Sequence, residues 1–201
     1  RKIVDLAKND NALIIADEAH SVGIFGKNYS GIVSKLGLNK EVDIIIGTLG
    51  KGFGVFGSYV ACDDILKEYL INKSRPFIFT TALPPFVIGS LTESLKIVEN
   101  EGRGKTLLEK AFYLKNKLKN EGYDTGESES QIIPVITGAN KTALELMTFL
   151  KDRGFFVPAV RPPTVPPNKA RIRISLSYSH NYQDIDNLFE AIRDFFEKGN
   201  S

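Results

Sequence analysis

The sequence predicts an α/β protein in two parts, because short apolar strand patterns alternate with amphipathic helix patterns along most of the chain. In the first part, strands are expected at four places: Leu13–Ala16, Asp43–Ile46, Ser58–Ala61 and Phe77–Phe79. Continuous apolar runs are typical of strands that are covered on both faces. We therefore expect a mostly parallel sheet with helices packed on it.

Helix patterns separate and follow these strands. A short one covers Gly31–Leu36, and a longer one covers Asp63–Asn72. Two long patterns come next, Phe86–Asn100 and Lys105–Asn120, with glycines at the break between them. Their length predicts that they connect two domains, so residues 84–122 are assigned as connecting helices between residues 1–83 and 123–201.

The third segment begins with a polar loop after Tyr123 and continues as a smaller α/β domain. Its expected elements, in chain order, are the strand Ile132–Ile136, the helix Lys141–Arg153, the strands Phe155–Ala159 and Ile172–Leu176, and the helix Asp184–Glu197. The last helix has an apolar stripe at helical spacing, which indicates core packing.

The beginning of the chain resembles the middle of a larger sheet. Residues Arg1–Lys8 have helical spacing and lead into the apolar strand Leu13–Ala16. A helix that feeds a fully apolar strand belongs in the interior of an α/β sheet rather than at its edge. We therefore expect the sequence to be a fragment that lacks an N-terminal portion.

Composition excludes several classes of function. Lys and Arg number 26 against 24 Asp and Glu, a net charge of +2, so no polybasic nucleic-acid surface is expected. The longest uncharged run, Pro76–Thr92, is broken by prolines and hydroxyl residues, so no membrane span is expected. One cysteine and two histidines give no credible metal site. A cytoplasmic enzyme or binding protein is the default.

The first chemistry-bearing segment is Asp17-Glu18-Ala19-His20, directly after an apolar strand. Ligands of open α/β sheets bind beyond the carboxyl ends of the strands. The same four letters occur in helicases, but that function requires a phosphate loop. The nearest candidate, 47–52, has the wrong spacing and no hydroxyl after its lysine. An Asp that merely caps a turn remains an alternative.

The second segment places Lys51 among four glycines, also just after a strand. Burial against a ligand would lower the pKa of this amine and let it form a Schiff base. A Schiff-base lysine together with an acidic partner, here Asp17, is the pairing expected for pyridoxal phosphate. Hydroxyls of Thr48, Thr80 and Thr81 are candidates for the phosphate. A glycine-rich turn with an exposed lysine is the alternative.

Three segments together resemble the α-oxoamine synthases: residues 17–23, 47–51 and 77–85. The resemblance covers nearly the whole chain but only the second half of such an enzyme. It implies the fold-type-I, aspartate aminotransferase-like architecture of pyridoxal phosphate-dependent transferases, with part of the large domain and a smaller C-terminal α/β domain. It also implies that Lys51 holds the cofactor, Asp17 pairs with its ring nitrogen and His20 hydrogen-bonds near its phenolic oxygen.

Residues 159–166, with Arg161-Pro162-Pro163-Thr164, resemble the 8-amino-7-oxononanoate synthase branch, which acts in biotin biosynthesis. This resemblance implies decarboxylative condensation of L-alanine with a pimeloyl thioester of coenzyme A or acyl carrier protein. Prolines stiffen the loop and fix the direction of Arg161, whose guanidinium suits a carboxylate. Arg161 and Thr164 are therefore expected to bind the amino acid, although a surface arginine is the alternative.

The resemblance further implies a homodimer with its active site at the subunit interface, where Thr80 and Thr81 serve the neighbouring subunit. Two other outcomes stay open. One is a sister synthase, namely glycine C-acetyltransferase (2-amino-3-ketobutyrate CoA ligase) or 5-aminolevulinate synthase, and the other is a fragment without catalysis. Arg171 and Arg173 are expected to form structural ion pairs, and His180 to serve in a loop.

Overall fold

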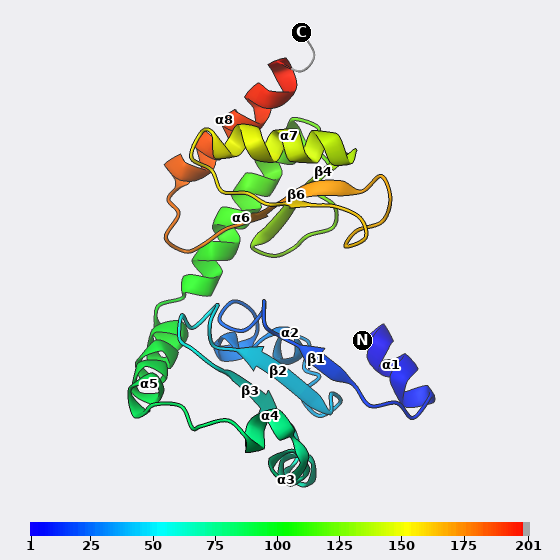
Figure 1. The fold of residues 1–201 in the computed structure, drawn as a ribbon, viewed down its shortest axis with the longest axis vertical. Helices are drawn as coiled ribbons and strands as arrows, with labels where there is room; N and C mark the ends of the chain where they lie inside the picture. Colours follow the sequence, from blue (N-terminus) through cyan, green and yellow to red (C-terminus); the bar gives the residue numbers. More distant parts are fainter. Residues whose placement is uncertain (199–201) are drawn as a thin grey trace. The chain divides into compact units, whose positions relative to one another are not determined.

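A computed structural model describes residues 1–198, which form two compact units, Arg1–Lys105 and a second that begins at Thr106 (Figure 1). Each unit is described by itself. The division falls within the range 84–122 that the sequence assigns to connecting helices. Within residues 1–198, no helix is both long and apolar enough to cross a lipid bilayer.

The first unit contains a three-stranded sheet in the order β1 (Ile15–Asp17), β2 (Ile44–Thr48) and β3 (Ser58–Ala61). Strands β1 and β2 are parallel, with Asp17 opposite Ile46, whereas β2 and β3 are antiparallel. The sequence predicts a mostly parallel sheet, and of the two strand pairings among the described residues of this unit one is parallel and one is antiparallel. Because β1 and β2 are parallel, both strands end at the same edge of the sheet, which is where ligands of open α/β sheets bind.

The helical segments of the first unit are α1 (Lys2–Asn9), η1 (Lys27–Tyr29), α2 (Ile32–Lys35), α3 (Asp64–Lys73), α4 (Arg75–Ile78) and α5 (Pro85–Asn100). The strand expected at Phe77–Phe79 is wrong, because this segment belongs to the turn of α4. Pro76 stands in the first turn of that helix, where proline is well tolerated. The Phe79 N–H then donates to the Arg75 carbonyl. A three-residue apolar run does not distinguish a strand from a helix.

One face of the first sheet is packed against α1 and α2. Buried side chains from Val4, Val33 and Leu38 form this small core, with Ile14, Ala16, Val42 and Ile45 packed against it. The other face is open in this chain: Ile15 is 61% exposed and Val60 is 49% exposed. The sheet is thus covered on one side only by the described residues.

The second unit combines the rest of α6 (Arg103–Asn120) with β4 (Ile132–Gly138), α7 (Asn140–Lys151), β5 (Ala159–Val160), β6 (Ala170–Ser175) and α8 (Tyr182–Lys198). Its strands are antiparallel in the order β4-β6-β5. The strand expected at Phe155–Ala159 is displaced, since the ladder starts only at Ala159. Helix α7 contacts both β4 and β6 and also packs on α8 (Figure 1).

The core of this unit follows the alternation of its strands. Ile133 and Val135 of β4 and Ile172 and Ile174 of β6 are buried and lie opposite one another in the ladder. Fully buried helix residues complete the core: Leu114, Leu118, Leu146, Leu150, Ile185 and Ile192. The alternate residues of β6, among them Arg173, lie on the other face of the sheet, which is the more exposed one.

Candidate functional site

Asp17 is the last residue of β1 and lies at the same sheet edge as the end of β2. Its side chain is exposed, and its Oδ1 accepts a hydrogen bond from the Ala19 N–H at 2.9 Å. The carboxylate therefore does cap a turn, as the alternative interpretation holds. Because the turn occupies one oxygen, the second remains able to face a ligand at the edge of the sheet.

Lys51 lies in a tight loop between β2 and β3. The Leu49 N–H donates to Gly57 O and the Val55 N–H to Leu49 O, both at 2.9 Å, so the loop closes on itself. The lysine side chain is exposed, and the burial expected from the sequence is absent among the described residues. The flanking glycines explain this exposure, since they supply no side chains to cover the amine.

The structure joins the two motifs directly. The Nζ atom of Lys51 lies 3.1 Å from Nε2 of His20. These residues come from different strand–loop junctions, 31 positions apart in the chain. The expectation that the first two segments meet at one site is therefore met in the geometry of the first unit.

The backbones of the two loops are in contact beneath this pair. A Cβ atom placed at Gly52 would lie 2.4 Å from the carbonyl oxygen of Val22. Gly23 has a φ of +81°, and its own Cβ would lie 3.0 Å from the Cα of Gly52. Only glycine fits such an approach. The close packing of the loops brings His20 and Lys51 within hydrogen-bond distance.

The three threonines proposed for the phosphate occupy two different places. Thr48 is the last residue of β2, directly before the Lys51 loop, and its hydroxyl contacts Gly57 O and the Gly50 N–H, each at 3.4 Å. Thr80 and Thr81 lie in an exposed segment between α4 and α5, and the Thr80 hydroxyl donates to the carbonyl of Pro76. Thr48 is thus part of the site at the sheet edge, and the other two belong to a separate surface segment.

Arg161 and Thr164 belong to the second unit, in the loop after β5. The Thr164 N–H donates to the Arg161 carbonyl at 3.0 Å, and the peptide bond between Pro162 and Pro163 is cis. Both side chains are exposed. The backbone of this loop is therefore ordered by a turn, and the guanidinium is available at the surface of the unit.

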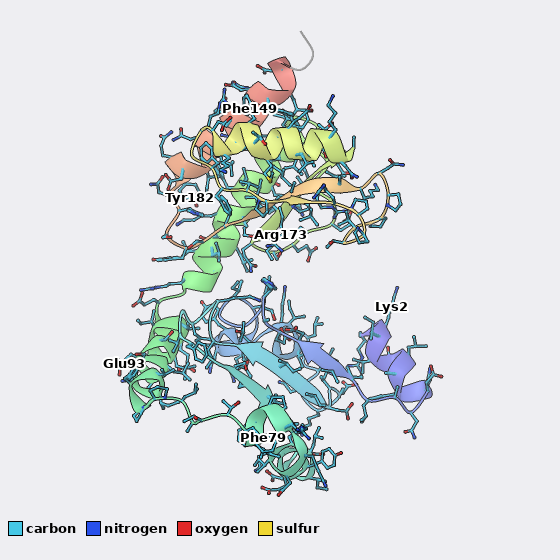
Figure 2. All side chains as sticks on the ribbon, viewed as in Figure 1. Lys2, Phe79, Glu93, Phe149, Arg173 and Tyr182 are labelled. Carbon is cyan, nitrogen blue, oxygen red and sulfur yellow. The ribbon has the colours of Figure 1, made fainter. Side chains whose placement is uncertain are left out.

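The ion pairs expected for Arg171 and Arg173 are wrong for the part of the chain that is described. Neither guanidinium lies within 4 Å of a carboxylate there, and Arg171 Nε donates instead to Lys169 O at 2.9 Å. Arg173 projects from β6 on the more exposed face of its sheet (Figure 2). Because side chains alternate between the two faces of a strand, Arg171 and Arg173 share the face opposite the buried alanine and isoleucines of residues 170–174.

His180 is confirmed as a loop residue, because it lies between the end of β6 and the start of α8, where its Nδ1 accepts a hydrogen bond from the Ser177 N–H at 3.1 Å. No group of three or more histidine, cysteine or acidic side chains that could hold a metal ion occurs in residues 1–198.

Glu18 is a residue that the sequence analysis does not single out. Its side chain is 3% exposed, and its two oxygens accept the backbone N–H groups of Ile32 and Val33. The only sequence signal is its place beside Asp17, which does not reveal that the carboxylate turns inward.

Comparison with known proteins defines the class first. Residues 1–192 match the model of the aminotransferase class I and II family, and the chain belongs to that family. Its fold is that of the fold-type-I pyridoxal phosphate-dependent transferases, as the sequence predicts.

The relatives in sequence then narrow the similarity. The chain is 44% identical over 190 residues to a putative 8-amino-7-oxononanoate synthase of Desulfosudis oleivorans, covering 94% of the chain and 48% of that protein. It is 40% identical over 193 residues to the 8-amino-7-oxononanoate synthase of Lysinibacillus sphaericus, covering 96% and 50%. The resemblance to this branch is thus confirmed. The chain spans about half the length of the curated relatives it matches.

Solved structures of two differently named enzymes share the architecture of this chain. Serine palmitoyltransferase of Sphingomonas wittichii superposes with a TM-score of 0.90 at 28% identity, over 98% of the chain and 50% of that protein. An SPT structure described as holding a PLP internal aldimine gives a TM-score of 0.89 at 29% identity, with the same coverage. The 8-amino-7-oxononanoate synthase of Francisella tularensis gives 0.85 at 27%, over 100% and 59%.

Proposed function

We propose that this chain supplies the cofactor-binding lysine and the amino-acid-binding arginine of a pyridoxal phosphate-dependent acyltransferase. The reaction condenses L-alanine with a pimeloyl thioester to give 8-amino-7-oxononanoate, carbon dioxide and the free thiol carrier, a step of biotin biosynthesis. The observation that carries the proposal is the 3.1 Å contact between Lys51 Nζ and His20 Nε2 at the edge where Asp17 ends β1. The names of the sequence relatives support the choice of substrates.

The residues at this edge fit pyridoxal phosphate. An aldehyde carbon requires an amine, and the exposed amine of Lys51 lies on a loop whose glycines leave room around it. A pyridine nitrogen requires an acid, and Asp17 is an exposed carboxylate at the end of the neighbouring strand. Thr48 adds a hydroxyl for the phosphate at the end of β2, directly before this loop. When bound, the cofactor supplies an electron sink for a carbanion at the amino acid Cα.

The chain's own residues then have separate tasks. Lys51 binds the cofactor and, once displaced by alanine, takes the proton from the alanine Cα. With Lys51 protonated, Nε2 of His20 accepts in their contact, which places the imidazole proton on Nδ1. Arg161 and Thr164 bind the carboxylate of the amino acid, because a guanidinium makes paired hydrogen bonds to a carboxylate.

The proposal includes a homodimer. A homodimer would let Thr80 and Thr81 contribute to the cofactor phosphate of the neighbouring subunit. Support comes from their position in an exposed segment outside the Lys51 loop. The thioester is carried by coenzyme A or by acyl carrier protein.

A sister reaction is the second candidate. The structural similarity to serine palmitoyltransferase favours an enzyme that accepts serine and a different acyl thioester. Glycine-using relatives, such as glycine C-acetyltransferase and 5-aminolevulinate synthase, share the expected chemistry. A fragment that folds without catalysis is the non-enzymatic alternative.

Product analysis separates these candidates. A protein that carries this chain at the length of its relatives is incubated with alanine, glycine or serine against pimeloyl, acetyl, succinyl and palmitoyl thioesters. The proposal predicts that alanine with a pimeloyl thioester gives the highest kcat/KM and that Lys51→Ala abolishes turnover. A higher kcat/KM for serine or glycine would replace the proposed reaction with the sister reaction.

A further inference from the structure

The Glu18 carboxylate lies inside the first unit, although its neighbours Asp17 and His20 are exposed. Its Oε2 accepts the Ile32 N–H at 2.9 Å and its Oε1 accepts the Val33 N–H at 2.6 Å. At 3% exposure, the group has lost its water and depends on these two donors. Hydrogen bonds to a charged acceptor are the stronger kind, so the carboxylate holds residues 32 and 33 firmly.

The surrounding backbone is shaped around this carboxylate. A Cβ at Gly31 would lie 2.7 Å from Oε2 of Glu18, and the φ of Gly31 is +114°. The segment between them is closed by backbone hydrogen bonds, from the Gly23 N–H to Tyr29 O and from the Gly31 N–H to Phe25 O, each at 2.8 Å. Residues 18–33, which include η1 and the first two residues of α2, therefore form one closed segment, here called loop 18–33, whose two ends are joined through Glu18.

Loop 18–33 contains His20 and also packs against the loop that contains Lys51. His20 lies two residues after Glu18, and the Ser21 and Val22 N–H groups both donate to the Glu18 carbonyl, at 2.9 Å and 3.1 Å. Val22 then packs against the backbone of Gly52, the residue after Lys51. A displacement of Glu18 would move His20 and remove the support beneath the Lys51 loop together.

We propose that Glu18 is a positioning residue. By joining the two ends of loop 18–33, it holds His20 and the Lys51 loop in the relative position, here called their register, that keeps His20 Nε2 within hydrogen-bond distance of Lys51 Nζ. It touches neither residue with its side chain carboxylate and acts only through the backbone. The functional importance of the register rests on the proposed role of Lys51, but the positioning itself does not.

Two substitutions weaken the join in different ways. Glu18→Gln keeps the shape but turns an NH2 group toward one of two backbone donors, and Glu18→Asp keeps the charge but shortens the reach. Asp63→Ala is the matched control, since the Asp63 side chain also accepts a helix N-terminal N–H, from Leu66 at 2.7 Å, but lies on α3 away from the loop. The control distinguishes the general effect of losing a hydrogen bond at a helix N-terminus from the specific loss of the relative position of His20 and Lys51.

The readout is the ¹⁵N chemical shift of His20 Nε2 and of Lys51 Nζ in the folded chain without cofactor. Lys51→Ala defines the His20 shift when the contact is absent. The proposal predicts that Glu18→Gln and Glu18→Asp move the His20 signal at least half of the way to that value, while Asp63→Ala leaves it in place. If Glu18→Gln and Glu18→Asp fold and leave both signals unchanged, Glu18 is a structural residue only and the proposal is wrong.

A second readout separates this proposal from the proposed function. In a protein of the relatives' length, reductive trapping with pyridoxal phosphate measures the labelling of Lys51. An altered His20 shift without any labelling of Lys51 in the parent protein would support the positioning role and contradict the cofactor assignment. Labelling that is at least threefold lower in Glu18→Gln than in Asp63→Ala would support both, and equal labelling with unchanged shifts would overturn the positioning role.

Discussion

Adding one methyl group on either side of Lys51 is expected to have opposite consequences. Gly50 and Gly52 flank the lysine, and neither has a positive φ. A Cβ at Gly50 has its nearest neighbours at 3.9 Å, whereas a Cβ at Gly52 lies 2.4 Å from Val22 O. The obstacle at Gly52 is backbone, which cannot rotate away as the end of a side chain would.

The magnitudes follow from these distances. Gly50→Ala fits, and the reduced freedom of the unfolded chain should stabilise the protein by about 0.4–1 kcal/mol. Gly52→Ala must separate the two loops, and such overpacking costs about 1–3 kcal/mol. The expected gap between the variants in the free energy of unfolding is therefore roughly 3 kcal/mol, the sum of mid-range values.

Urea unfolding measures that gap, and the ¹⁵N shift of His20 Nε2 reports whether the contact with Lys51 survives. Gly50→Ala should keep the parent shift, and Gly52→Ala should lose it even under conditions where it is fully folded. If Gly52→Ala proves as stable as Gly50→Ala and keeps the parent His20 shift, the loop contact does not set the register of the site.

Three further outcomes are expected. Asp17→Asn should leave folding and cofactor binding in place but lower kcat by orders of magnitude, measured in a protein of the relatives' length, because an unprotonated ring is a poor electron sink. Arg161→Ala should weaken L-alanine binding by about tenfold to a hundredfold in spectral titration, with Arg161→Lys recovering only part; unaltered affinity would make Arg161 a surface residue. The pKa of Asp186 is held below its ordinary value of 3.8, first by the hydrogen bond from Lys117 and then by that from Tyr113. Ionised Asp186 therefore stabilises the folded protein at pH values above 3.8, and this stabilisation should be lost as the pH falls through the lower pKa of the folded state. The urea midpoint of Asp186→Asn should consequently fall less steeply with acid than that of the parent.

Local sequence patterns were sufficient to predict most elements of the fold. Alternation of apolar strands and helix patterns located the sheets of both units, and the glycines around Lys51 marked a loop beyond a strand. The prediction of a strand at Phe77–Phe79 was wrong because three apolar residues are too few to show a periodicity. The segment is instead part of a helical turn that has Pro76 in its first turn. The direction of β3 also escaped prediction, since a pattern of apolar residues does not encode whether neighbouring strands run parallel.

Residue type suggested part of the proposed site. Asp17 and Lys51 were proposed from an acid and an amine just after strands, and the role of His20 came from the family resemblance. The structure brings His20 and Lys51 within 3.1 Å of each other. Glu18 was not predictable, because its role depends on two backbone N–H groups that meet it only after folding. Arg171 was misassigned to an ion pair for the same reason, since sequence does not show which carboxylates come within reach.

The assignment of Lys51 as the cofactor lysine is tested most directly by covalent trapping. A protein that carries this chain at the length of its relatives is loaded with pyridoxal phosphate, reduced with borohydride, digested and mapped by mass spectrometry, with Lys51→Ala as the control. The account predicts one pyridoxyl label per chain, on the peptide that contains Lys51, and its loss in the control. A stoichiometric label on another lysine, with none on Lys51, would contradict it.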